Sequence, residues 1–171
     1  PPDITFSKKE LGLPEEGFVF CCFNNTYKIT PTTFDSWARI LDKVEESVLM
    51  LYVNNEFSQK NLIKETIARD IDPQRLIFGD SLPRPQYLAR YKVADLFLDT
   101  APYNAGTTAS DALRMGLPVL TLCGNAYPSR MASSILNAVN LPELITHSEY
   151  EYETLAIELA SHPEKLKNLK E

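Results

Sequence analysis

The sequence has no apolar run of the roughly 20 residues that a membrane-spanning helix needs, and no apolar leader stands at its start. Its 2 histidines and 3 cysteines do not fall at the spacing of a zinc site, and no serine–histidine–aspartate arrangement is evident. Glycine is scarce, with 6 residues, and neither the G-x-G-x-x-G motif nor the P-loop lysine motif occurs. These absences argue against a membrane partner, a metal centre, dinucleotide binding and P-loop hydrolysis.

Basic residues are in the minority: 17 Lys and Arg stand against 23 Asp and Glu, which gives a formal net charge of -6. A nucleic-acid-binding surface needs an excess of Lys and Arg, so we expect no nucleic-acid partner. The cysteines are odd in number and lack the spacing of a disulfide framework, which predicts a reducing, cytoplasmic compartment.

The 171 residues are enough for one domain with its own hydrophobic core, and 44% hydrophobic with 23% charged residues is the composition of a globular protein. No repeat, low-complexity tract or linker interrupts the chain, so we expect residues 1–171 to form a single domain. The chain begins Pro1-Pro2-Asp3 without an initiator methionine. We therefore expect it to be a fragment of a longer protein.

Short apolar runs alternate with amphipathic helical stretches along the whole chain. The runs predict strands at 17–23, 47–53, 75–78, 95–99, 119–122 and 144–146. Helices are expected at 30–44, 59–70, 84–93, 107–115, 129–139, 150–161 and in the Lys-rich end. Strands alternating with helices, and apolar along their whole length, indicate a parallel sheet covered on both faces. The fold class is therefore α/β, with a doubly wound, mainly parallel, Rossmann-like sheet.

The segment after the strand at 95–99 has the composition of an anion site. Gly106 allows the backbone to approach a ligand, and Thr107 and Thr108 begin a helix whose positive end suits a diphosphate. Asp111, one turn later, is placed to accept hydrogen bonds from the hydroxyls of a sugar such as ribose. The plainer interpretation is that Thr107 only caps the helix and Gly106 only serves the turn.

Two further segments follow strands of the same sheet. At 23–28, two amides and a hydroxyl precede Lys28, which is suited to neutralise a phosphate, although a turn with a solvated lysine fits equally well. After the third strand, Arg84, Tyr87 and Arg90 share one helix face, where Tyr87 or Arg84 can stack on a planar base and Arg90 can point at a ligand's charge. A solvated helix face is the alternative there. Because ligands bind at the carboxyl ends of parallel strands, we expect the three segments to meet at one edge.

One stretch, Asp70-Ile71-Asp72, matches the bare Asp-x-Asp pattern with which some transferases hold a metal. It ends a predicted helix and precedes the third strand, which puts it at the amino edge of the sheet. We therefore expect no metal there and no cofactor elsewhere.

At these segments the sequence resembles the catalytic region of the O-GlcNAc transferase and SPINDLY-like glycosyltransferase family. The family's catalytic part is a GT-B fold, two Rossmann-like lobes with the donor between them, and this chain is similar to the C-terminal lobe, from about Gly12 to Leu169. The matching runs, too many for a generic Rossmann domain, are Gly12 to Glu15, Phe23 to Pro31, Ala94 to Thr100, Tyr103 to Asp111, Gly116 to Thr121 and Ser129 to Ser134.

The resemblance implies roles for individual residues. Lys28 would contact the diphosphate of the donor as the catalytic cation, with Asn25 nearby. Thr107 and Thr108 would hold phosphate and Asp111 ribose. The region from Leu82 to Arg90 would face the base, through Leu82, Arg84, Tyr87 and Arg90. Four positions depart from the animal enzymes: Asn25 stands for a glutamine, Gly106 and Tyr87 for histidines, and Arg84 for a lysine.

These departures keep a nucleotide site but leave the donor open, with UDP-GlcNAc as the first choice and GDP-fucose as the second. The resemblance implies an inverting transfer of the sugar to Ser or Thr hydroxyls of a protein, with the catalytic histidine, the other lobe and helical TPR repeats supplied by the rest of the parent protein. Two other hypotheses are a non-catalytic nucleotide-binding or scaffolding domain and half of a sugar-nucleotide epimerase, although we see no acid/base residues for the latter.

Overall fold

The computed structural model of the chain describes residues 8, 11–14, 16–53, 55–79, 84–101, 104–123, 131–139 and 141–170. Within these ranges, no helix has both the length and the apolar character needed to cross a bilayer.

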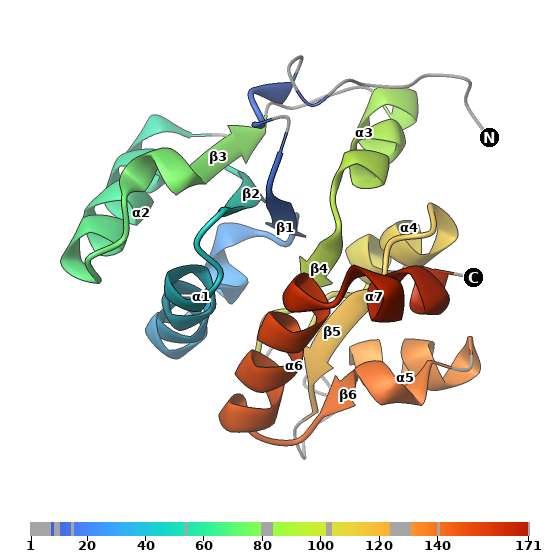
Figure 1. Cartoon of the computed structure of the whole chain (residues 1–171). Coiled ribbons are helices and arrows are strands. Elements are labelled where there is room, and N and C mark those ends of the chain that lie inside the picture. The colour runs from blue at the N-terminus through green and yellow to red at the C-terminus, as the bar shows by residue number, and fades with distance from the viewer. Residues whose placement is uncertain are drawn as a thin grey trace.

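The strands form one parallel sheet in the order β3-β2-β1-β4-β5-β6 (Figure 1). Their bounds are β1 Phe18–Cys22, β2 Ser47–Tyr52, β3 Leu76–Gly79, β4 Leu96–Leu98, β5 Val119–Leu122 and β6 Ile145–Thr146. The chain adds strands on one side of β1 and then returns to its other side with β4. The predicted doubly wound sheet is confirmed, and the reversal of strand order lies between β1 and β4, where such sheets bind ligands.

Helices cover both faces of the sheet. They are α1 Pro31–Lys43, α2 Glu56–Ala68, α3 Arg84–Arg90, α4 Thr107–Arg114, α5 Met131–Ala138, α6 Glu149–Ser161 and α7 Pro163–Lys170. Single 3-10 turns stand at η2 Thr26–Lys28, η3 Pro73–Arg75, η4 Tyr91–Val93 and η6 Pro142–Leu144. Helices α1 and α6 pack together on one face, and α4 and α5 on the other (Figure 1).

The predicted helices are present, and their ends depend on local capping. The Thr30 hydroxyl accepts a hydrogen bond from the backbone nitrogen of Thr33, and Pro31 is the first residue of α1. Helix α2 begins at residue 56 rather than 59 because Asn55 caps it, accepting from the nitrogen of Ser58. The helix expected at 84–93 is α-helical only to Arg90 and ends as the 3-10 turn η4.

The core consists of the central strands and the helix faces that cover them. Trp37 of α1 is fully buried, and its indole nitrogen donates to the hydroxyl of Tyr152 on α6 at 2.9 Å. The Tyr152 hydroxyl in turn donates to the backbone oxygen of Asp99 at 2.8 Å, just beyond the end of β4. This buried chain of hydrogen bonds ties α1 and α6 to the edge of the sheet where ligands are expected.

Candidate anion site at the strand reversal

The loops that leave β1 and β4 meet at the point where the strand order reverses. After β1 the chain turns through Asn24 and Asn25 into η2, which carries Lys28. The Lys28 Nζ donates to the backbone oxygen of Asn104 in the β4–α4 loop at 3.2 Å. The cation is therefore held beside the start of α4, as the convergence of the first two segments predicted. Asn25 is exposed next to it.

The first turn of α4 is fixed by a side chain that directly follows β1. The Thr108 hydroxyl donates to Asn24 Oδ1 at 2.5 Å, and Asn24 Nδ2 donates to the hydroxyl of Thr100 at 2.8 Å. Gly106 is the N-cap residue and has no side chain with which to cap the helix. Thr107 is exposed and is the first residue of α4 rather than its N-cap, so the plainer interpretation of Thr107 as a cap is not what the structure shows.

Gly106 lies against the first residue of α5. A Cβ atom at this position would lie 2.7 Å from the sulfur of Met131, the first residue of α5. The close approach that the glycine allows in this structure is therefore to α5. Asp111 lies one turn into α4 and is only 3% exposed.

A residue that the sequence analysis did not select, Asp99, organises the β4–α4 loop. Its Oδ1 accepts from the backbone nitrogens of Thr100 at 2.8 Å and Ala105 at 2.7 Å, and its Oδ2 accepts from the hydroxyl of Thr121 on β5 at 2.7 Å. Asn24 Nδ2 also lies 3.4 Å from Oδ1. Burial raises the pKa of Asp99 from 3.8 to about 6, although each of these hydrogen bonds lowers it. The only sequence signal was an acidic residue directly after an apolar strand.

The third predicted segment reaches the same edge through aromatic packing. The Tyr87 ring lies 6.5 Å from the ring of Phe23, which directly follows β1, and the Tyr87 hydroxyl is 2.6 Å from that of Tyr91. The guanidinium of Arg90 stacks 4.7 Å from the centre of the Phe23 ring and 5.7 Å from that of Tyr87. Thus Tyr87 and Arg90 are joined to the end of β1.

Arg90 differs from the expectation of a guanidinium that points at a ligand's charge. It is fully buried, and burial lowers its pKa. Gly79, at the end of β3, makes room for it, because a Cβ there would lie 2.5 Å from Arg90 Nη1. In this position Arg90 supports the Tyr87 ring from within the fold. Arg84 is the first residue of α3, and Leu82 lies outside the described residues.

The Asp-x-Asp stretch lies where the sequence indicated, between α2 and β3. Asp70 adopts a left-handed backbone (φ 61°) at the end of α2, and Asp72 caps η3 by accepting from the nitrogen of Gln74 at 2.9 Å. Both residues have structural tasks at the amino edge of the sheet, away from Lys28.

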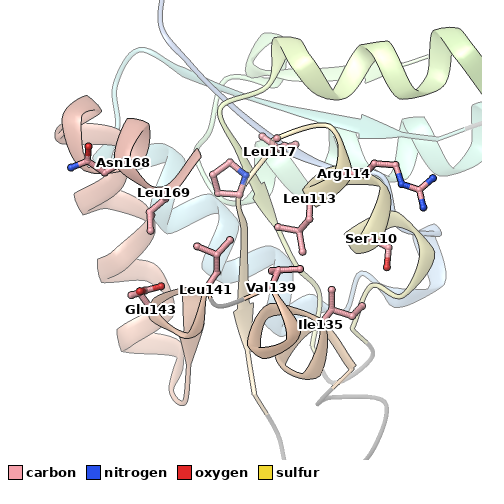
Figure 2. Close-up of a pocket in the computed structure, with 12 residues that line it drawn as sticks. Ser110, Leu113, Arg114, Leu117, Ile135, Val139, Leu141, Glu143, Asn168 and Leu169 are labelled. Carbon is pink, nitrogen blue, oxygen red and sulfur yellow. The ribbon is translucent and has the colours of Figure 1, made fainter. Parts of the chain in front are cut away.

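A cavity of about 660 Å³ lies away from Lys28, between α4, α5 and α7 (Figure 2). Its apolar lining includes Leu113, Leu117, Ile135, Val139, Leu141 and Leu169. Leu117 and Pro118 immediately precede β5, so the cavity borders the amino end of that strand, whereas Lys28 and Thr108 follow the carboxyl ends of β1 and β4. Despite its size, this cavity is not part of the candidate anion site.

In doubly wound α/β sheets ligands bind at the strand reversal, and helix N-termini suit anions; this chain has a lysine and a helix N-terminus at that edge. Comparison with known families makes the assignment specific. The model of glycosyl transferase family 41 matches residues 2–171, and the chain belongs to this family.

Individual relatives agree with the family assignment. The chain is 34% identical over 164 residues to a UDP-N-acetylglucosamine–peptide N-acetylglucosaminyltransferase of Caenorhabditis elegans, covering 96% of this chain and 14% of that protein. It is 37% identical to the tomato (Solanum lycopersicum) SPINDLY protein, a probable enzyme of the same name, covering 90% of this chain and 17% of the relative.

Among solved structures, a mutant of Thermobaculum terrenum O-GlcNAc transferase superposes with a TM-score of 0.88 at 34% identity, covering 99% of this chain and 32% of that one. The expected resemblance and fold class are thereby confirmed, and the transferase relatives argue against the epimerase hypothesis. The chain spans 14–17% of the length of these curated relatives.

Proposed function

We propose that this chain is the donor-binding lobe of an inverting glycosyltransferase that transfers GlcNAc from UDP-GlcNAc to Ser or Thr hydroxyls of proteins. The observation that carries the proposal is the meeting of Lys28 with the N-terminus of α4, through the hydrogen bond from Lys28 Nζ to the oxygen of Asn104. A cation and a helix N-terminus at one point suit a diphosphate better than any neutral ligand.

In this proposal the diphosphate lies over the first turn of α4. The Thr108 hydroxyl already donates to Asn24, so the phosphate oxygens accept from the amides of Thr107 and Thr108 and from the hydroxyl of the exposed Thr107. Lys28 meets the negative charge that grows as the sugar–phosphate bond breaks and is the catalytic residue of this lobe. Asn25 lies beside it.

The nucleoside occupies the side of the site toward α3. Asp111 holds the ribose, Gly106 and Leu82 border the donor, and Tyr87 with Arg84 faces the base. Arg90 takes part from beneath, by supporting Tyr87. The catalytic histidine and the acceptor-binding surface come from other parts of the parent protein.

The donor is UDP-GlcNAc rather than GDP-fucose, because both the Caenorhabditis elegans relative and the tomato SPINDLY relative are named as UDP-GlcNAc transferases, the latter as a probable one. No metal is needed, because Lys28 and the helix end supply the positive charge that an Asp-x-Asp-bound ion supplies in other transferases. Asp72 is already engaged in capping η3.

The test is a transfer assay with the full-length parent protein and Ser/Thr-containing peptides, in excess EDTA, followed by mass spectrometry. We expect a HexNAc mass increment with UDP-GlcNAc and none with GDP-fucose. Transfer that stops on chelation and returns with Mg²⁺ or Mn²⁺ would contradict the metal-free mechanism, and transfer of fucose would contradict the donor. No transfer from either donor would favour the non-catalytic binding domain.

A further inference from the structure

The carboxylate of Asp99 determines which way the side-chain amide of Asn24 points. An ionised carboxylate oxygen only accepts, so Asn24 turns Nδ2 toward Asp99 and Oδ1 toward α4, where Oδ1 accepts from the Thr108 hydroxyl. Nδ2 is held on that side by two acceptors, the Thr100 hydroxyl at 2.8 Å and Asp99 Oδ1 at 3.4 Å. The orientation of Asn24 therefore depends on an acceptor being present at Asp99.

The same carboxylate also fixes the partner of Lys28. Asp99 Oδ1 holds the backbone nitrogen of Ala105, and the preceding residue, Asn104, supplies the oxygen that accepts from Lys28. Asn104 Nδ2 donates back to the oxygen of Thr100 at 2.8 Å, which closes the loop on itself. The buried carboxylate of Asp99 is thus connected by hydrogen bonds both to the partner of Lys28 and, through Asn24, to the first turn of α4.

We propose that Asp99 is a positioning residue of the donor site: its carboxylate positions Thr108 through Asn24, and it positions Lys28 through the peptide group that joins Asn104 to Ala105. The inference rests on the proposed function in one respect, that the ligand of this edge is a sugar nucleotide. Asp99 itself is 2% exposed and lies behind the loop, so it acts on the ligand through these neighbours.

The ionisation of Asp99 gives the proposal a signature in pH. Its raised pKa, about 6, means that the folded protein binds this proton more tightly than the unfolded chain does. The contribution of Asp99 to the free energy of unfolding therefore falls as pH rises from about 4 to about 6. The positioning role requires that ligand affinity rise over the same pH range, because only the ionised carboxylate makes charge-assisted hydrogen bonds to all its donors. Acidification should stabilise the fold through this group while it weakens ligand binding.

The ionisable groups that face Asp99 come from three elements. Cys22 of β1 and Tyr152 of α6 both have pKa values raised by burial, so they stay neutral around pH 6. Lys28 lies on η2, across the loop. Two further carboxylates come from α6: Glu149, which lines a small cavity together with Asp99, and Glu153, which accepts from the Ser36 hydroxyl at the same cavity. Glu149 is half exposed and pairs with Arg39 at 3.9 Å.

The experiment measures binding of UDP-GlcNAc to the full-length protein without an acceptor, by calorimetry between pH 5 and 8. UDP-GlcNAc is the probe because each of its phosphates has one ester and one anhydride bond and keeps one charge throughout this range, whereas free UDP has a terminal phosphate that titrates near pH 6. Thermal melting of the same samples is recorded in parallel. The variants are Asp99→Asn and, as the matched control, Glu149→Gln.

For Asp99→Asn at pH 7.5 we expect roughly a 5- to 100-fold weaker affinity, because the amide places an N–H where a buried donor needs an acceptor. In the wild-type protein the affinity falls roughly three- to tenfold between pH 7.5 and pH 5, and in Asp99→Asn this dependence is lost. Glu149→Gln keeps both the affinity and the pH dependence of the wild type. Asn24→Ala weakens binding as well, and serves as the test if Asp99→Asn does not fold.

Three outcomes would overturn the proposal: wild-type affinity in Asp99→Asn at pH 7.5, wild-type affinity in Asn24→Ala, or tighter binding on acidification. The last would mean that the charge of Asp99 repels the diphosphate more than its hydrogen bonds order the site. If the wild-type protein binds no UDP-GlcNAc at any pH, the proposed function fails. If the wild-type protein binds UDP-GlcNAc and Asp99→Asn and Asn24→Ala bind it equally well, the positioning role fails while the proposed function stands.

Discussion

At the scale of single residues, the candidate site depends on which atoms are already engaged. Thr108 has one hydroxyl proton, and Asn24 accepts it, so the backbone amide of Thr108 is what remains for a phosphate. The ammonium group of Lys28 donates to Asn104. With three N–H groups, an ammonium can contact more than one acceptor, so the bond to the β4–α4 loop is compatible with contact to an anion.

Replacing Lys28 by Ala in the full-length protein should lower the rate of transfer roughly a hundred- to a thousand-fold, the usual effect of losing one donor to a charge that develops in the transition state. Folding should change little, because a single partly exposed hydrogen bond contributes only about 1 kcal/mol. The measurements are initial transfer rates and thermal melting.

The matched control for this prediction is Lys64→Ala, which removes an exposed lysine of α2. It should leave the transfer rate unchanged. A folded Lys28→Ala protein with the wild-type rate would place Lys28 outside the catalytic site.

At the scale of elements, the apolar runs predicted the strands to within a residue or two. A strand that is buried on both faces needs apolar side chains along its whole length, so its sequence is a continuous apolar run. Helix ends were harder to predict. Helix α2 starts at Glu56 because of the Asn55 cap, and apolar spacing carries no information about that cap. The importance of Asp99 was not predictable either, because its partners Asn24 and Thr121 lie 75 and 22 residues away in the sequence.

Removing the cap of α2 with Asn55→Ala should cost about 1 kcal/mol. In a domain of this size that lowers the melting temperature by about 2–4 °C. Donor binding should not change, because α2 lies beside β3 at the far edge of the sheet from α4 (Figure 1). Ser58→Ala, on the same turn, keeps the cap and serves as the control. An unchanged melting curve for Asn55→Ala would show that the cap contributes nothing to the fold.

At the scale of the whole molecule, the chain covers 32% of the solved Thermobaculum terrenum relative. The proposed donor site lies at one edge of one sheet, and the acceptor groups are assigned to other parts of the parent protein. This division, predicted from the sequence, still stands as a prediction, and it can be tested on the chain by itself.

The isolated chain should bind UDP weakly and show little or no transferase activity. In the proposed function the other lobe encloses the sugar and supplies the base, so in the isolated chain the sugar should stay in water and the acceptor hydroxyl should lack a base. Calorimetry with UDP and a transfer assay with UDP-GlcNAc measure the two quantities. Robust turnover by these 171 residues would mean that the lobe is a complete enzyme.

The central claim is that the diphosphate of a sugar nucleotide lies between Lys28 and the first turn of α4. The most direct measurement is a crystal structure of the full-length protein with UDP bound. We expect diphosphate oxygens at about 3 Å from Lys28 Nζ and from the backbone nitrogens of Thr107 and Thr108, with no metal ion between them. UDP bound in the apolar cavity between α4, α5 and α7, or a diphosphate held by a metal away from Lys28, would contradict the account.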